Sequence, residues 1–163
     1  MTDDNIRKIS DCKLELNNIR EWINKNNLHS NVRYLVAYSV VKASGTIEIV
    51  FKSMVYDLLA ENASLETKSY LTRMIIDSSC NPSTGNIGKI LEQINVDKKK
   101  AFDINIKEAP EGMEQKANLN SLVSLRNDIA HGRSIGSTIN TVTKYFDSGV
   151  EVLNILDAVL YNY

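Results

Sequence analysis

The spacing of apolar residues constrains the fold of this 163-residue chain more than any other feature of its sequence. Apolar residues recur three and four positions apart over most of its length, which is the period of a helix with one buried face. Only 7 glycines and 2 prolines interrupt the pattern, so the chain has few residues that break long helices. The sequence therefore predicts an all-α fold.

Five to six helices are expected, and capping residues indicate where several of them begin. Thr2 or Asp3 caps the first helix, Ser64 the third, and Asn81 followed by Pro82 the fourth. The second helix is the longest, carries the widest apolar stripe and forms the core. The expected ranges are about 3–24, 32–61, 64–78, 81–94 and 114–131, with a final helix that starts at 137 or 138.

The packing of these helices is predicted from the links between them. The third and fourth helices are expected to form an antiparallel pair, and the last two helices a hairpin joined by the turn at 132–136. Residues 96–114 are the least regular part of the chain. Ile104 and Ile106 alternate there like a short strand, but nothing obvious pairs with such a strand, so a loop is expected.

Length and charge limit the classes of protein that fit. A chain of 163 residues is long enough for one sizeable core, so residues 1–163 are expected to form a single domain. A formal net charge of −1 provides no overall attraction to nucleic acid, and any RNA contact must come from local clusters. Lys98, Lys99 and Lys100 form such a cluster, which is either a solvated face or a contact to a phosphate backbone.

Cysteines and termini give further expectations. Cys12 and Cys80 stand alone, without the spacing of a zinc site or a disulfide framework, so no metal or cofactor is expected. The chain opens with Thr2-Asp3-Asp4 rather than a basic start and an apolar run, which does not fit a secretory signal. No stretch has the roughly 18 consecutive apolar residues of a membrane span. A cytoplasmic protein without a membrane segment is expected.

The segment from Leu119 to Gly132 carries polar residues where a core helix normally has none. Arg126 falls inside the apolar stripe of this helix, and a guanidinium keeps its charge when it is buried. Such a position indicates either a structural ion pair or a pocket that receives an anion. Asn127 and His131 share another face, where Asp128 can also approach His131. Gly132 is expected to end the helix.

Glu48 is a further candidate, because it lies at the edge of the apolar stripe of the long second helix. One interpretation pairs it with Lys52, four residues later, on the helix surface. The other turns Glu48 inward, where it neutralises or orients Arg126 across a helix interface.

Three segments in the same order resemble one known family. Arg126 and His131 are separated by four residues near the end of a helix, and this spacing resembles the Arg-x4-6-His signature of the HEPN superfamily. Two other segments are similar to the RiboL-PSP-type HEPN domains of bacteria: Ala43-Ser44-Gly45-Thr46-Ile47-Glu48, and Asn81-Pro82-Ser83. The resemblance covers roughly residues 32–161.

The resemblance implies an all-α helical bundle that pairs as a symmetric dimer and cleaves RNA without a metal ion. It implies a bacterial defence or toxin–antitoxin setting, with an antitoxin or other defence protein as a possible partner. Arg126, Asn127 and His131 would be the catalytic residues. Arg133 stands where a related group of toxins has a tyrosine that a partner nucleotidyltransferase modifies, so that regulation is not expected. Arg133 either assists at the RNA backbone or favours the helix C-terminus.

The spacing of the motif supplies a separate argument for a dimer. On a straight helix Arg126 and His131 point roughly 140° apart, so one copy does not easily aim both at one phosphate. A two-fold dimer brings two copies of each residue to one cleft. The competing interpretation is a non-catalytic helical module that binds a protein or RNA, and the near-neutral charge favours it mildly. A nucleotide-binding or unrelated enzymatic role is the third alternative.

Overall fold

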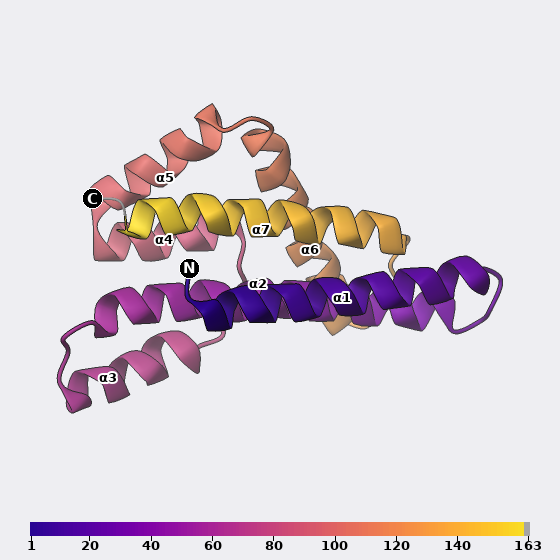
Figure 1. The fold of residues 1–163 in the computed structure, drawn as a ribbon, viewed down its shortest axis with the longest axis horizontal. Coiled ribbons are helices and arrows are strands. Elements are labelled where there is room, and N and C mark those ends of the chain that lie inside the picture. Colours follow the sequence, from indigo (N-terminus) through magenta and orange to yellow (C-terminus); the bar gives the residue numbers. More distant parts are fainter. Residues whose placement is uncertain (162–163) are drawn as a thin grey trace.

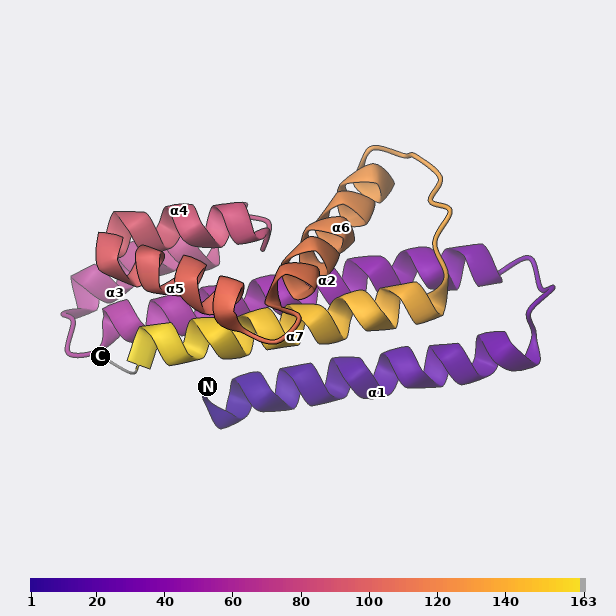
Figure 2. The same cartoon turned by 90° about the horizontal axis from the view of Figure 1, so that it is seen from above.

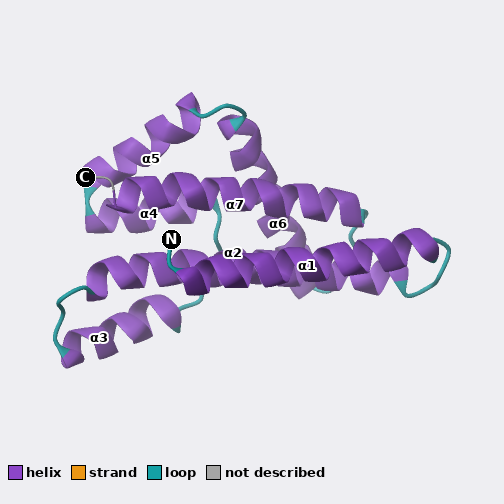
Figure 3. Ribbon diagram, in the orientation of Figure 1, coloured by secondary structure: helices purple, strands orange, loops and turns teal. Residues whose placement is uncertain are grey.

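The computed structural model describes residues 1–161, and within them every regular element is helical (Figure 3). Seven α-helices and one π-helical segment account for these elements, so the all-α fold class is confirmed. In chain order the elements are α1 (Asp3–Lys25), α2 (Val32–Ala60), α3 (Leu65–Leu71), η1 (Thr72–Ile76), α4 (Thr84–Ile94), α5 (Val96–Glu108), α6 (Gly112–Ala130) and α7 (Ile139–Tyr161).

Three long helices, α1, α2 and α7, lie alongside one another and form the body of the molecule (Figures 1 and 2). α2 is the central one, because it also packs against α6, α3 and η1. Its buried apolar residues recur with the expected helical spacing and belong to one continuous core. They include Val36, Val40, Ala43, Ile47, Val50, Phe51, Met54 and Val55.

α2 is also the one described helix that could cross a membrane by length and composition alone, with a mean hydropathy of 1.3 over its most apolar window. Half of that window is buried inside the fold. The apolar character of α2 is accounted for by its central place among α1, α6 and α7, since a helix enclosed on several sides carries apolar residues on more than one face.

Two helices approach closely in the core at Gly149, and not at Gly45. The Ser44-Gly45 pair suggests a tight helix contact, yet a Cβ at Gly45 would meet no atom within 4 Å. The tight contact is at Gly149 of α7, where a Cβ would lie 3.1 Å from Cδ1 of Ile47 and 3.3 Å from Cδ1 of Leu119. The missing side chain at Gly149 thus allows α7 to pack closely on α2 and α6.

The expected loop at 96–114 is wrong, because most of it forms α5. The side chain of Asn95 caps this helix by accepting hydrogen bonds from the backbone N–H groups of Asp97 and Lys98. Phe102 and Ile106, four residues apart, are the buried pair. Ile104 is 52% exposed, so the alternation of Ile104 and Ile106 reflects opposite helix faces rather than a strand.

The three consecutive lysines at the start of α5 are all engaged within the chain. The Lys98 ammonium donates to the carbonyls of Val159 and Leu160, at 3.0 Å each, near the C-terminal end of α7, where a cation is favoured. Lys99 pairs with Asp103, and Lys100 with Asp97 at 3.2 Å. This run therefore fits helix capping and local pairing better than a phosphate contact.

The expected antiparallel pair of the third and fourth helices is also wrong. α3 continues into η1, and both pack against α2, whereas α4 packs against α5 and α6. α3 and α4 make no contact with each other within the described residues. Capping residues predict where these helices begin, but the choice of partner depends on which apolar faces meet in three dimensions.

α6 and α7 pack together as the expected C-terminal pair, and α6 crosses α7 obliquely (Figures 1 and 2). The beginning of α6 lies near the middle of α7, while its C-terminal end projects away from α7 toward the side where α4 lies (Figure 2). α6 also packs on α2. This oblique crossing places the C-terminal half of α6, with the Arg126–His131 segment, on the face opposite α1.

Candidate active site

The candidate site begins with the way α6 ends. His131 is the C-cap residue, and Gly132 follows with φ +73°, a left-handed conformation that glycine adopts without strain. The backbone N–H of Gly132 donates to the carbonyl of Ile129 at 2.9 Å, and that of Arg133 to Asp128 at 2.9 Å. This pair of hydrogen bonds is the Schellman ending, so the prediction that Gly132 ends the helix is confirmed.

Arg126 lies one turn before this ending and is half-buried. Its one hydrogen bond among the described residues is a long contact of 3.4 Å to the side-chain oxygen of Asn127, and no carboxylate within those residues forms an ion pair with it. A guanidinium offers five N–H donors, and most of these remain available here. Of the two interpretations of Arg126, the anion pocket fits this geometry and the structural ion pair does not.

Arg126 faces an open cavity of about 310 Å³. α2, the segment 79–81, α4 and α6 each contribute residues to the lining, so the cavity joins parts of the chain that are far apart in sequence. Its lining includes Glu48, Cys80, Asn81, Lys89, Ile90 and Arg126. The three sequence segments that resemble the RiboL-PSP-type HEPN domains thus meet at one place, through Glu48, Asn81 and Arg126.

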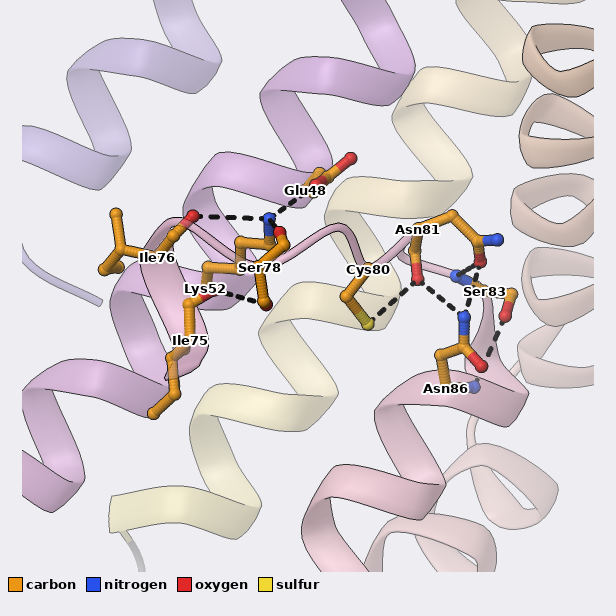
Figure 4. A network of polar contacts seen from close by, with 9 residues as sticks. All are labelled: Glu48, Lys52, Ile75, Ile76, Ser78, Cys80, Asn81, Ser83 and Asn86. Atoms are coloured by element: carbon orange, nitrogen blue, oxygen red, sulfur yellow. Dashed lines mark hydrogen bonds and ion pairs between the residues drawn. The ribbon is translucent and has the colours of Figure 1, made fainter. Parts of the chain in front are cut away.

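Glu48 is held by Lys52, the partner four residues later on α2. The Lys52 ammonium lies 2.6 Å from Oε1 of Glu48 and also donates to the carbonyls of Ile76, at 3.4 Å, and Ser78 (Figure 4). Lys52 is 7% exposed, so the cation of this pair lies inside the fold, while the partly exposed Glu48 carboxylate lies at the cavity wall. Glu48 does not form an ion pair with Arg126, although both side chains line the same cavity.

Asn81 is fixed by the residues that start α4. Its side-chain oxygen accepts hydrogen bonds from the Ser83 backbone N–H at 3.3 Å and from Nδ2 of Asn86 at 2.8 Å (Figure 4). Asn86 also donates to the Asn81 carbonyl at 3.1 Å. Ser83 rather than Asn81 is the N-cap of α4, because its hydroxyl accepts from the Asn86 N–H. Asn81 is therefore rigid but does not itself cap the helix.

His131 does not line this cavity; its side chain is exposed beyond the end of α6. Asp128 does not engage it either, because Oδ1 of Asp128 pairs with the Arg133 guanidinium at 3.0 Å. The expected approach of Asp128 to His131 is thus replaced by a pair that spans the helix ending. Within one protomer the structure brings Arg126 together with Glu48 and Asn81 but leaves His131 outside that group.

Sequence reasoning missed two features of the site. The spacing of Glu48 and Lys52 predicts their pairing, but nothing in that spacing signals that Lys52 is buried against backbone carbonyls. The sequence presents Cys80 as an isolated thiol, whereas in the structure it lines the cavity. Burial raises the pKa of the Cys80 thiol, which keeps it protonated at neutral pH and makes it a poor nucleophile.

Within residues 1–161, no group of three or more His, Cys, Asp or Glu side chains is arranged to hold a metal ion. The chemically active groups that line the cavity include an arginine without an acidic partner, the exposed Lys89, a carboxylate held by a lysine and a rigid amide. Such a set can bind an anion and form directed hydrogen bonds to a polar ligand.

The helical bundle, with an arginine and a histidine separated by four residues at the end of a helix, defines a HEPN-type domain. The model of the RiboL-PSP-HEPN family matches residues 2–162, nearly the whole chain. The chain belongs to the RiboL-PSP-HEPN family. No curated protein and no solved structure gave a match in the same comparisons.

Proposed function

We propose that this protein is a metal-independent endoribonuclease whose active site is completed by a second copy of the chain. The observation that carries the proposal is the half-buried Arg126. Its guanidinium has no acidic partner among the described residues and faces a cavity, and the exposed His131 follows at the end of the same helix. An arginine that serves only the fold would normally be paired. The family assignment supports the same chemistry, since HEPN domains are often ribonucleases.

The chemistry is an internal transfer at phosphorus. A ribose 2′-hydroxyl loses its proton and attacks the adjacent phosphate, the bond to the 5′-oxygen breaks, and that oxygen takes up a proton. The products are a 2′,3′-cyclic phosphate and a free 5′-hydroxyl. His131 is the group that moves a proton, because imidazole both accepts and donates protons near neutral pH. Arg126 binds the phosphate oxygens as negative charge builds on them, and Asn127 positions the phosphate or the imidazole.

A second copy is needed because one copy does not bring these groups together. Arg126 points into the cavity, whereas His131 lies outside it, beyond the helix ending. In a two-fold dimer, His131 of one copy can approach Arg126 of the other. We assign the surface for this pairing to α2. Four of its apolar side chains, each between 46% and 59% exposed, are Tyr34, Tyr38, Val41 and Ile49.

This surface of α2, here called the α2 stripe, is the uncovered half of a single helix face. Farther along the same face Lys52 is covered by the segment 76–78, whereas the stripe is exposed and the Tyr38 hydroxyl at its edge donates to Glu15 of α1. Gly45 lies within the stripe and leaves open space above the backbone. An apolar stripe around a glycine suits the close approach of a second α2 helix.

The alternative function is a non-catalytic module that binds a protein or RNA. The exposed α2 stripe favours it, because the same surface would suit a different protein partner.

The main proposal also includes a cellular setting. We propose a bacterial defence or toxin role, with an antitoxin or defence protein as a further partner.

Cleavage of a mixed cellular RNA pool in EDTA tests the proposal. The wild type should leave 2′,3′-cyclic phosphate ends, and His131→Ala and Arg126→Ala should each lose activity by about 100-fold or more. His29→Ala is the matched control, because His29 is the other histidine of the chain and is exposed near the end of α1. Equal inertness of the folded, dimeric wild type and both variants would overturn the ribonuclease and favour the binding module.

A further inference from the structure

We infer that the cavity beside Arg126 binds a guanine base, so that RNA is cleaved next to guanosine; this inference rests on the proposed ribonuclease function. The cavity of about 310 Å³ is at the lower end of the size range of ligand sites, which suits one nucleotide. Arg126 would hold the phosphate while the attached base enters the space between α2 and α4. The base then meets two fixed polar groups, Glu48 and Asn81.

Glu48 is the hydrogen-bond acceptor of this pocket. One carboxylate oxygen lies toward Lys52, and the other points away from it (Figure 4). A carboxylate has about four lone-pair positions, so the ion pair with Lys52 leaves several of them free. Because Lys52 also donates to two backbone carbonyls, the carboxylate is held in place before any ligand arrives.

Asn81 is the hydrogen-bond donor. Its oxygen is already used by the Ser83 N–H and by Asn86, which fixes the orientation of the amide. Its nitrogen lies on the side away from Asn86 (Figure 4) and has no hydrogen-bond partner among the described residues. The pocket therefore presents a rigid acceptor from α2 and a rigid donor from the segment before α4.

Guanine is the base whose edge matches this pair most fully. Its Watson–Crick edge has two adjacent donors, N1–H and the N2 amino group, which fit the two oxygens of one carboxylate. The neighbouring O6 can accept a hydrogen bond from the Asn81 amide. Adenine and cytosine offer one amino group and no second adjacent donor, while uracil offers a single N–H between two carbonyls that the carboxylate repels. Single-stranded RNA exposes these edges for such contacts.

Binding of mononucleotides in EDTA is the first test, because it does not depend on cleavage. The wild type should bind 3′-GMP at least about tenfold more tightly than 3′-AMP, 3′-CMP or 3′-UMP, as expected for one good bidentate contact. Inosine 3′-monophosphate lacks the N2 amino group and should lose most of this advantage. The 7-deaza form of 3′-GMP keeps the Watson–Crick edge and should bind like 3′-GMP. Equal binding of the four nucleotides, or a preference for another base, would overturn the inference.

Two variants test the residues. Asn81→Asp keeps the oxygen that accepts from Ser83 and Asn86 and replaces only the donating amide nitrogen. Glu48→Gln keeps the shape of the side chain and removes its charge. Each should reduce the preference for 3′-GMP to about threefold or less. Glu92→Gln is the matched control, since Glu92 is exposed on α4 and is not among the residues that line the cavity, and it should keep the preference. Unchanged selectivity in both test variants, or lost selectivity in Glu92→Gln, would overturn the assignment.

Cleavage of oligonucleotides that contain one guanosine in a uridine background completes the test. The wild type should cut next to the guanosine, and Asn81→Asp should cut at several positions. If no RNA is cleaved but 3′-GMP is still selected, the ribonuclease proposal fails and the guanine pocket stands. If RNA is cleaved at every position alike, the ribonuclease stands and the guanine pocket fails.

Discussion

Two cations near the cavity show how the surroundings of a residue decide its role. Lys52 is buried, and its ammonium is satisfied by Glu48 and by two backbone carbonyls, so it serves the fold. Arg126 is half-buried, but its guanidinium has only one long contact, to Asn127. A positive charge without an acidic partner beside a cavity is available to a ligand. At this scale Lys52 positions a carboxylate, whereas Arg126 is the cation that we propose binds the ligand.

Replacement of Lys52 by methionine should lower the free energy of unfolding by about 1–3 kcal/mol, because the carboxylate of Glu48 and two carbonyls lose their partner inside the fold. Urea denaturation measures this change. Lys42→Met on the same helix is the control, because Lys42 pairs with Glu15 at 2.8 Å where both side chains are about a third exposed. That exposed pair should be worth less than about 1 kcal/mol. A Lys52→Met protein as stable as wild type would show that the ammonium does not hold Glu48 in place.

At the scale of elements, α2 performs three tasks with two faces. One face forms the core with α1, α6 and α7, and its edge carries Glu48 into the cavity. The other face is covered near its C-terminal end by α3 and η1. The rest of that face is the α2 stripe, which is left exposed, with an open backbone at Gly45. Gly149 serves the core, because neighbouring side chains pack closely against it. Gly45 has open space above it, which leaves room for the proposed partner helix.

A charge in the α2 stripe should break the proposed dimer. Val41→Glu places a carboxylate on a side chain that is 46% exposed in the single copy, so the fold should tolerate it, while burial against a second copy would not. Sedimentation should show a monomer for Val41→Glu and a dimer for the wild type. Leu14→Glu is the control, because Leu14 is 62% exposed on α1 and should leave the dimer intact. A dimer that persists in Val41→Glu would place the interface elsewhere.

For the whole molecule, the oblique crossing of α6 over α7 determines what one copy can do alone. It directs Arg126 toward α2 and α4, and the Schellman ending leaves His131 at the surface. In the proposed ribonuclease, this arrangement puts the phosphate-binding Arg126 and the proton-transferring His131 of one copy at different places around the α6 terminus. The proposed second copy would bring the two groups together.

Mixing of two inactive variants tests whether the site is shared. If Arg126 of one copy works with His131 of the other, a heterodimer of Arg126→Ala and His131→Ala contains one intact site. Random exchange should then restore about a quarter of the wild-type activity, because half of the dimers are mixed and each has one of two sites. Refolding of the two variants together, followed by the EDTA cleavage assay, measures this. Restored activity below a hundredth of wild type would place Arg126 and His131 of a single copy at one phosphate.

The sequence by itself determined the features that depend on neighbouring residues. Helical spacing predicts most of the helices, and Thr2, Ser64 and Gly132 mark ends that the structure confirms. The Arg126–His131 spacing predicts a polar motif at the end of a helix. These features are local, because a helix and its caps form through hydrogen bonds within a few residues.

Only the tertiary structure decided which distant residues meet. α5 was missed because two of its isoleucines resemble a strand, and its burial against other helices settles the matter. The position of Glu48 in the sequence allows an ion pair with either Lys52 or Arg126. In the structure the segment 76–78 packs on α2 and holds the Lys52 ammonium beside Glu48, so Lys52 is the partner. The cavity itself joins residues from three helices and a loop, and no periodic pattern in the sequence encodes that encounter. Helix spacing specifies faces, whereas the shape of the assembled core determines which faces come together.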